Sequence, residues 1–460
     1  MMTTIGPGSV VRRSRAAGFI LTALALFATA GVRAGQLEFY DPFEVMAEVR
    51  RLEAQPLWPG FEPGAVPTGL FDGERTILFD FPKIPPGFKP LEGRAGVLVH
   101  EGPHPAVFGN TRVRFDDVWM AASIPVCRSE FTGLAISLTD IAGIVIHEKF
   151  HVFQAIHHPG WRPNDAVLLV YPPDTAKVLK ARSLELEALR RAVLSFAPGA
   201  AAWAKTALAL RRERQADLDD NLTLYERESQ RFEGLAEYVE YKASGKPAAE
   251  DRMPIGFAPK AVREMGYLEG RWMADLLDRF DPGWQDGVEA GRIAYLEERL
   301  AEVLREGPRP AEFTADEEDL WTSDVRAAMA RKYADRQRML RQAGGKLGIT
   351  LIIEARNRPL RFQVFDPFSL ETLGPHELFH SQYMSLKNEQ GVVAIVGMQV
   401  LTETDAGGRV VRLIVSGLSR RPYLRTNLKD LRFQWDGVYI SLRSVRFRAR
   451  GPYAYVLDLD

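Results

Sequence analysis

Residues 138–160 constrain the fold more strongly than any other stretch, because their apolar pattern continues over several turns of helix. Thr139 or Asp140 can cap the start, an almost unbroken apolar run follows, and Pro159-Gly160 stops it. The pattern predicts a buried helix around which neighbouring elements must pack.

Polar residues inside this predicted helix form the pattern H-E-x-x-H. His147 and His151 are four residues apart, so they leave the same face of the helix one turn apart, and Glu148 lies beside them. Burying these groups is costly unless something satisfies them, and a divalent metal ion is a simple solution. The alternative is a core helix whose polar groups find hydrogen-bond partners.

The same pattern occurs at residues 100–104, where helix chemistry excludes a metal site. Pro103 lacks an amide hydrogen and clashes with the carbonyl one turn earlier, Gly102 weakens a helix further, and Pro105 follows directly. We expect a turn between strands here.

A third match spans residues 376–380. It follows Gly374-Pro375, which a helix start tolerates, but the flanking residues 360–365 and 392–396 are rich in β-formers. No later acid in a convincing helical pattern supplies a third ligand. We therefore expect surface or cross-strand histidines, with a metal role as the alternative.

Two histidines need at least one more protein ligand, and residues 225–241 offer it. They are predicted to form a helix with Glu233, Glu237 and Glu240 along one face, and the small Gly234 permits close helix contact. Although isolated glutamates usually form a solvated face, the presence of the histidine helix favours Glu233 as the third ligand.

These two segments resemble a known superfamily. The sequence VIHEKFHVFQ at 145–154, followed by FEGLAEYVE at 232–240, is similar to the gluzincin metallopeptidases, in which two helix histidines and a later glutamate hold zinc. Their aminopeptidases carry the third ligand in an Asn-Glu-Gly-Phe-Ala stretch, which maps to Glu233 and not Glu237. Phe232 departs from that stretch, and 81 residues separate His151 from Glu233, so the resemblance is to the superfamily alone.

The resemblance implies a zinc-dependent hydrolytic site. Zn²⁺ would be held by His147, His151 and Glu233, and Glu148 would be the general base that takes a proton from water. A tyrosine often stabilises the oxyanion in such sites, and the candidates are Tyr238, Tyr241 and Tyr267, each of which can equally be a packing residue.

An exported zinc metallopeptidase acting on a peptide or protein substrate is therefore the predicted function. One alternative is a non-catalytic zinc-containing protein that binds through its C-terminal β domain, although a structural site would not need Glu148. Another is a zincin-like amidase on cell-wall substrates.

The first 34 residues predict export. Three arginines precede an apolar run at 16–30, and Ala34 ends a small-residue cleavage site, so a signal peptide and a periplasmic or secreted protein are expected, with no stable membrane span after cleavage. An uncleaved anchor is the alternative. Cleavage would remove four of the 59 basic residues and none of the 60 acidic ones, and a net charge near −5 makes nucleic acid an unsuitable partner.

The predicted fold class is α+β, with a zincin-like, mostly helical catalytic domain. Long helices over 176–245 would separate the two ligand helices, and the strand at 118–125 is either a substrate-binding edge strand or a core strand. The expected segments are a signal peptide (1–34), a β-containing region of the catalytic unit (35–130), the helical catalytic domain (131–313), a helical linker (314–345) and a β-rich C-terminal domain (346–460).

Overall fold

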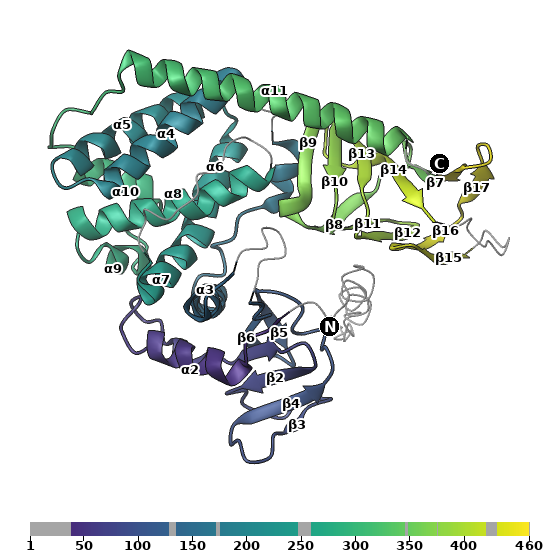
Figure 1. Cartoon of the computed structure of the whole chain (residues 1–460), viewed down its shortest axis with the longest axis horizontal. Coiled ribbons are helices and arrows are strands. Elements are labelled where there is room, and N and C mark those ends of the chain that lie inside the picture. Colours follow the sequence, from purple (N-terminus) through teal and green to yellow (C-terminus); the bar gives the residue numbers. More distant parts are fainter. Residues whose placement is uncertain are drawn as a thin grey trace, which may run out of the picture.

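The computed structural model contains a helical region between a small N-terminal sheet and a β-rich C-terminal part (Figure 1). This confirms the α+β class and the order of helical and β-rich regions. The boundaries expected between domains remain predictions. The structure describes residues 38–127, 135–171, 175–246, 259–345, 348–374, 376–419 and 430–459, so the expected signal peptide lies outside the described residues.

The N-terminal part is a six-stranded sheet of order β3-β4-β2-β1-β6-β5 with one flanking helix. Within it, β1 and β6 pair in parallel and the other neighbours are antiparallel. Its elements are α2 (Pro42–Leu52), η2 (Pro63–Ala65), β1 (Thr68–Phe71), β2 (Arg75–Phe79), β3 (Lys89–Pro90), β4 (Val97–Glu101), β5 (Thr111–Phe115) and β6 (Val118–Ser123).

Helix α3 (Leu138–His157) follows this sheet and packs against α2, β5, β6 and α7. Its N-cap is Ser137, not Thr139 or Asp140 as the sequence suggested. The Ser137 hydroxyl accepts from the Asp140 amide, and the Asp140 carboxylate accepts from the Ser137 amide, so Asp140 completes a capping box from the third helical position. The Thr139 hydroxyl instead donates to Glu48.

The remaining helices confirm the long helices expected over 176–245, which the structure shows to be interrupted before Gly199. They are η3 (Asp165–Val170), α4 (Ala176–Leu194), α5 (Gly199–Gln215), α6 (Asp220–Ser229), the π-helical turn η4 (Gln230–Gly234), α7 (Leu235–Ser244), α8 (Pro259–Phe280), α9 (Trp284–Glu289), α10 (Leu296–Val303) and α11 (Ala315–Gly345). The long α11 crosses α4 and reaches β13 and β14, which links the helical and C-terminal parts (Figure 1).

Two sheets form the C-terminal part, in the orders β17-β18-β7-β14-β13-β10-β9 and β15-β16-β12-β11-β8, and they enclose a shared apolar core. Leu370 and Leu378 belong to the large core of the helical region, so the two parts also pack together. Residues 392–402 and 439–448 are each divided between two strands, at Gly397 and at Ser444, where φ is positive. The strands and connecting turn are β7 (Ile349–Glu354), β8 (Arg361–Phe365), η6 (Pro367–Ser369), β9 (Leu370–Gly374), β10 (Glu377–His380), β11 (Tyr383–Asn388), β12 (Gly391–Val396), β13 (Val400–Thr404), β14 (Val410–Leu418), β15 (Asp430–Trp435), β16 (Val438–Arg443), β17 (Arg446–Ala449) and β18 (Ala454–Asp458).

None of the helices in the described ranges combines the length and the apolar character needed to cross a membrane.

Candidate metal centre

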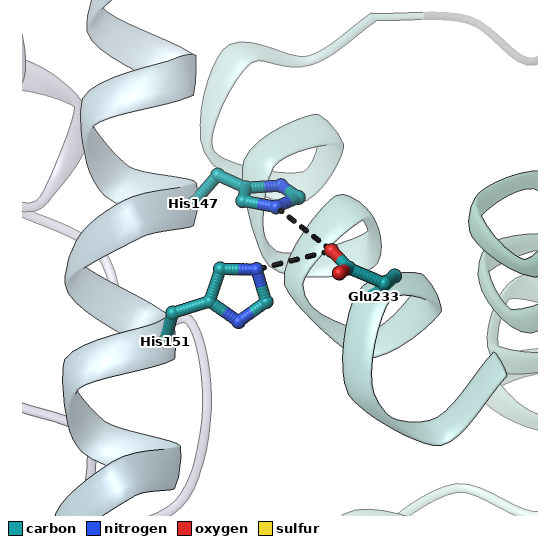
Figure 2. Close-up of side chains that lie close together, drawn as sticks. All are labelled: His147, His151 and Glu233. Carbon is teal, nitrogen blue, oxygen red and sulfur yellow. Dashed lines mark hydrogen bonds and ion pairs between the residues drawn. The ribbon is translucent and has the colours of Figure 1, made fainter. Parts of the chain in front are cut away.

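The structure brings together the three side chains that the sequence singled out as metal ligands. His147 and His151 leave the same face of α3, and Glu233 approaches them from η4 (Figure 2). The Nε2 atoms of His147 and His151 lie 3.8 Å and 3.2 Å from Glu233 Oε2. All three side chains are buried, so their polar atoms converge where little water can satisfy them.

This donor set fits a zinc ion. Zinc binds imidazole nitrogen and carboxylate oxygen at about 2.0–2.2 Å, and tetrahedral geometry then places neighbouring donor atoms about 3.4 Å apart. The two measured N–O separations fall on either side of that value, and the ligand atoms of all three residues lie within 4.8 Å of one another. The three residues would leave a coordination position for water.

Both imidazoles have a second partner that turns Nε2 toward the centre. The Gln154 side-chain amide donates to the Phe232 carbonyl, so its Oε1, 2.7 Å from His151 Nδ1, accepts from that nitrogen. On His147, Nδ1 lies 3.3 Å from Glu240. A metal-bound histidine commonly donates its other N–H to such a group, which fixes the tautomer and the orientation of the ring.

Glu233 reaches the centre from a π-helical turn inside an otherwise continuous helix. The turn comes very close to α8, where a Cβ placed on Gly234 would lie 2.5 Å from the Gly270 Cα. Both positions therefore require glycine, which agrees with the expectation of a close helix contact at Gly234. π-Helical turns are uncommon and often occur at functional sites, because they shift side chains relative to the regular helix.

An arginine fixes the other carboxylate oxygen of Glu233. Arg263 on α8 donates to Glu233 Oε1 at 2.5 Å and to Asp165 at 2.8 Å. Burial raises the pKa of Glu233, but Arg263 and His151 more than offset this and hold the pKa well below its usual range. The carboxylate is therefore ionised, as a metal ligand must be, and Oε2 is the atom left toward the histidines.

Glu148 lines a cleft that opens beside the three ligands. The cleft has a volume of about 220 Å³, and His151, Phe232, Glu233 and Tyr267 also contribute to its wall. Burial raises the pKa of Glu148 above its usual value, because the apolar surroundings disfavour the charged form. Unlike Glu233, it is not among the clustered metal-ligand groups, which suits a residue that exchanges protons at the cleft.

Of the three candidate tyrosines, Tyr267 lies at the site. It lines the cleft, and its ring stacks on His147 with 5.9 Å between centroids. Burial and the neighbouring Glu233 raise its pKa well above the ordinary value, so the hydroxyl keeps its proton. Tyr238 instead hydrogen-bonds Asp278, and Tyr241 packs against Arg271.

Glu237 and Glu240 lie on the other side of His147 and form a second group with it. Burial and the like charge of Glu240 raise the pKa of Glu237 to about 7. This second group has one imidazole and two carboxylates, and it shares His147 with the first. The first group supplies two imidazoles and therefore suits zinc better, while Glu240 is placed beside His147 Nδ1, where it can orient the ring.

The other two H-E-x-x-H segments form no such centre among the described residues. His100 lies in strand β4, which ends at Glu101, and His104 follows in the connection to β5, as the prolines predicted. His376 is exposed in a turn, whereas His380 is buried on β10 and stacks on Phe362. The β-structure expected around the third match is thus confirmed.

The sequence left open whether the strand near residues 118–125 is a substrate-binding edge strand or a core strand, and the strand order decides between the two. The strand at 118–123, β6, lies between β1 and β5 and is therefore a core strand. The sheet edge is β5, which also contacts α3. Its sequence, TRVRF, alternates polar and apolar residues, a signal that could have located this strand in the sequence, although its edge position follows only from the strand order.

Comparisons with protein-family models, curated proteins and solved structures gave no match.

Proposed function

We propose that the protein is a zinc-dependent hydrolase of peptide bonds, with His147, His151 and Glu233 as metal ligands and Glu148 as general base. The observation that carries the proposal is the convergence of both Nε2 atoms on Glu233 Oε2, beside a cleft that contains Glu148. Zinc bound there would supply a Lewis acid that polarises the carbonyl and lowers the pKa of a bound water toward neutrality.

The residues of the chain then have separate roles in hydrolysis. Glu148 takes the proton of the attacking water and returns it to the departing amine, and its raised pKa suits it to both transfers near neutral pH. The hydroxyl of Tyr267 is protonated and lies in the cleft wall, so it can donate to the carbonyl oxygen as negative charge develops there. Gln154 and Glu240 hold the imidazoles in place.

The substrate in this proposal is a peptide or protein, and the site of action is outside the cytoplasm, as the N-terminal 34 residues predict. In zincins an edge strand can pair with extended substrate, and β5 would serve here because it borders both the cleft and α3. The gluzincin resemblance of the two ligand segments gives the same assignment of roles.

The first experiment measures bound zinc and hydrolysis of a peptide library in the wild type and in Glu148→Gln. The variant should keep about one zinc per chain and lose activity by about 10²–10⁴-fold, because the general base is removed while the ligands remain. Glu101→Gln is the matched control, since Glu101 holds the same place in the first H-E-x-x-H segment and is exposed. Unchanged hydrolysis in Glu148→Gln would exclude this residue as the base.

Measuring hydrolysis of purified peptidoglycan beside the peptide library distinguishes a cell-wall amidase from a peptidase. Zinc binding without hydrolysis of either substrate would favour a non-catalytic protein.

A further inference from the structure

Two arginines line the cleft without an acidic partner. Arg112 on β5 and Arg162, just after α3, both contribute to its wall, and neither forms an ion pair with a carboxylate in the described ranges. Arg263, the third arginine of the cleft, differs because it is held by Glu233 and Asp165. The cleft therefore has two guanidinium groups free to bind something else.

Arg112 is held next to the metal centre by aromatic stacking. Its guanidinium carbon lies 4.9 Å from the centre of the Phe232 ring, and the same ring stacks on His151 at 4.3 Å and 20°. A guanidinium over an aromatic ring is attracted electrostatically and loses little freedom when a ligand arrives. Phe232, where the aminopeptidases have Asn, thus positions a cation beside a metal ligand.

The charges of the cleft leave these arginines uncompensated once a metal is present. Among the described residues, three arginines and three acids line it, the acids being Glu148, Asp165 and Glu233. Burial and the proximity of Arg162 lower the pKa of Arg112, although a guanidinium keeps its charge at neutral pH. A bound divalent cation would make the sum positive, and an anionic substrate group would restore neutrality.

We propose that Arg112 and Arg162 form a subsite for a substrate carboxylate, so that the enzyme selects peptides carrying a carboxylate close to the scissile bond. This deepens the proposed function and rests on it. The carboxylate is either the C-terminal group of the peptide, which would make the enzyme a carboxypeptidase, or an Asp or Glu side chain. A guanidinium suits this group because its fork of N–H donors matches the two carboxylate oxygens.

The test uses a zinc-chelating dipeptide hydroxamate made in three forms. One has a free C-terminal carboxylate, one has a neutral C-terminal amide, and one has the amide with a Glu side chain. Calorimetric titration of the zinc-loaded protein should show at least one carboxylate form binding about tenfold or more tighter than the neutral amide. Which form gains affinity identifies the source of the carboxylate.

Arg112→Met should remove the preference for a carboxylate while the neutral amide still binds. Arg114→Met is the matched control, because Arg114 lies two residues along the same strand but is exposed and paired with Asp117. The control should keep the full preference. Arg162→Met should reduce it by a smaller factor, because Arg162 is more exposed and lacks the aromatic support of Arg112.

Equal binding of all three hydroxamates to the wild type would overturn the carboxylate subsite, while zinc binding and loss of hydrolysis in Glu148→Gln would still support the proposed function. A preference that survives in Arg112→Met would also overturn it. If the wild type binds no zinc, the proposed function fails, and the subsite fails with it.

Discussion

Two segments of this chain have the same H-E-x-x-H pattern in opposite surroundings. On α3, His147 and His151 point to one place and meet carboxylates from η4 and α7. On β10, His380 is buried and stacks on Phe362, while His376 lies exposed in the preceding turn. A spacing of four residues brings side chains together on a helix, where one turn has 3.6 residues, but separates them along a strand.

Burial also has different consequences in the two segments. Burial disfavours a charged His147, yet Glu233 and Glu240 raise its pKa well above the usual value. His380 has no hydrogen-bond partner among the described residues, and burial lowers its pKa to about 3. One environment has negative charge that a cation can neutralise, whereas the other admits only a neutral ring.

Replacing the helix histidines should have the largest effect, because it tests directly whether only the helix segment binds zinc. His147→Ala or His151→Ala removes one of three ligands, so bound zinc should fall from about one per chain to well under a tenth. His376→Ala and His380→Ala should keep the full content. Elemental analysis after dialysis gives the measurement, and zinc that survives His151→Ala but disappears with His380→Ala would reverse the assignment.

A smaller effect is expected from the residue that supports His151. Gln154→Leu removes the acceptor of the Nδ1 hydrogen and the link to the Phe232 carbonyl, so zinc affinity should weaken by about 10–100-fold. Competition with a chromogenic chelator measures this change. Gln55→Leu is a suitable control, because Gln55 is exposed and donates to a carbonyl of α7. Equal zinc affinity in wild type and Gln154→Leu would show that the ring needs no such support.

The shared face of His147 and His151 could be predicted because local pattern determines it. The apolar run around His147 specifies a buried helix, and the spacing of its polar residues specifies which face they share. Gln154, three residues after His151, is on that same face and was therefore within reach of sequence reasoning.

Other parts of the centre depend on contacts between distant segments. Arg263 follows Glu233 by 30 residues and belongs to another helix, so no spacing in the sequence connects them. The π-helical turn at Glu233 arises where η4 meets α8, and local preferences did not indicate it. Likewise, the position of Arg112 depends on β5 being an edge strand, which is determined by the order of the strands in the sheet.

Gly234→Ala tests the importance of the close contact of η4 with α8. The added Cβ would lie 2.5 Å from Gly270 Cα and 2.9 Å from the Gly266 carbonyl oxygen, and backbone atoms cannot rotate away. We expect a loss of about 2 kcal/mol in unfolding free energy and weaker zinc binding, because Glu233 moves with the turn. Denaturant unfolding of the metal-free protein measures the first effect.

Gly160→Ala provides the control for this substitution, because nothing lies within 4 Å of a Cβ at Gly160 and its φ is not positive. It should leave both unfolding and zinc binding nearly unchanged. Equal effects of the two substitutions would show that the contact between η4 and α8 is not the cause.

The pH dependence of the unfolding free energy should reveal that His380 is buried without a hydrogen-bond partner among the described residues. Its folded pKa of about 3 lies below the unfolded value near 6.5, so the unfolded chain takes up the proton first as the pH falls. The stability contributed by a neutral His380 is complete above pH 6.5 and is lost progressively toward pH 3. Between pH 7.5 and 5.5, the wild type should lose about 1.4 kcal/mol relative to His380→Leu. The same comparison with His376→Leu, at an exposed position, should give no such loss. A constant difference between wild type and His380→Leu across this range would mean that His380 finds a partner or water, and the two segments would then differ less than their structures indicate.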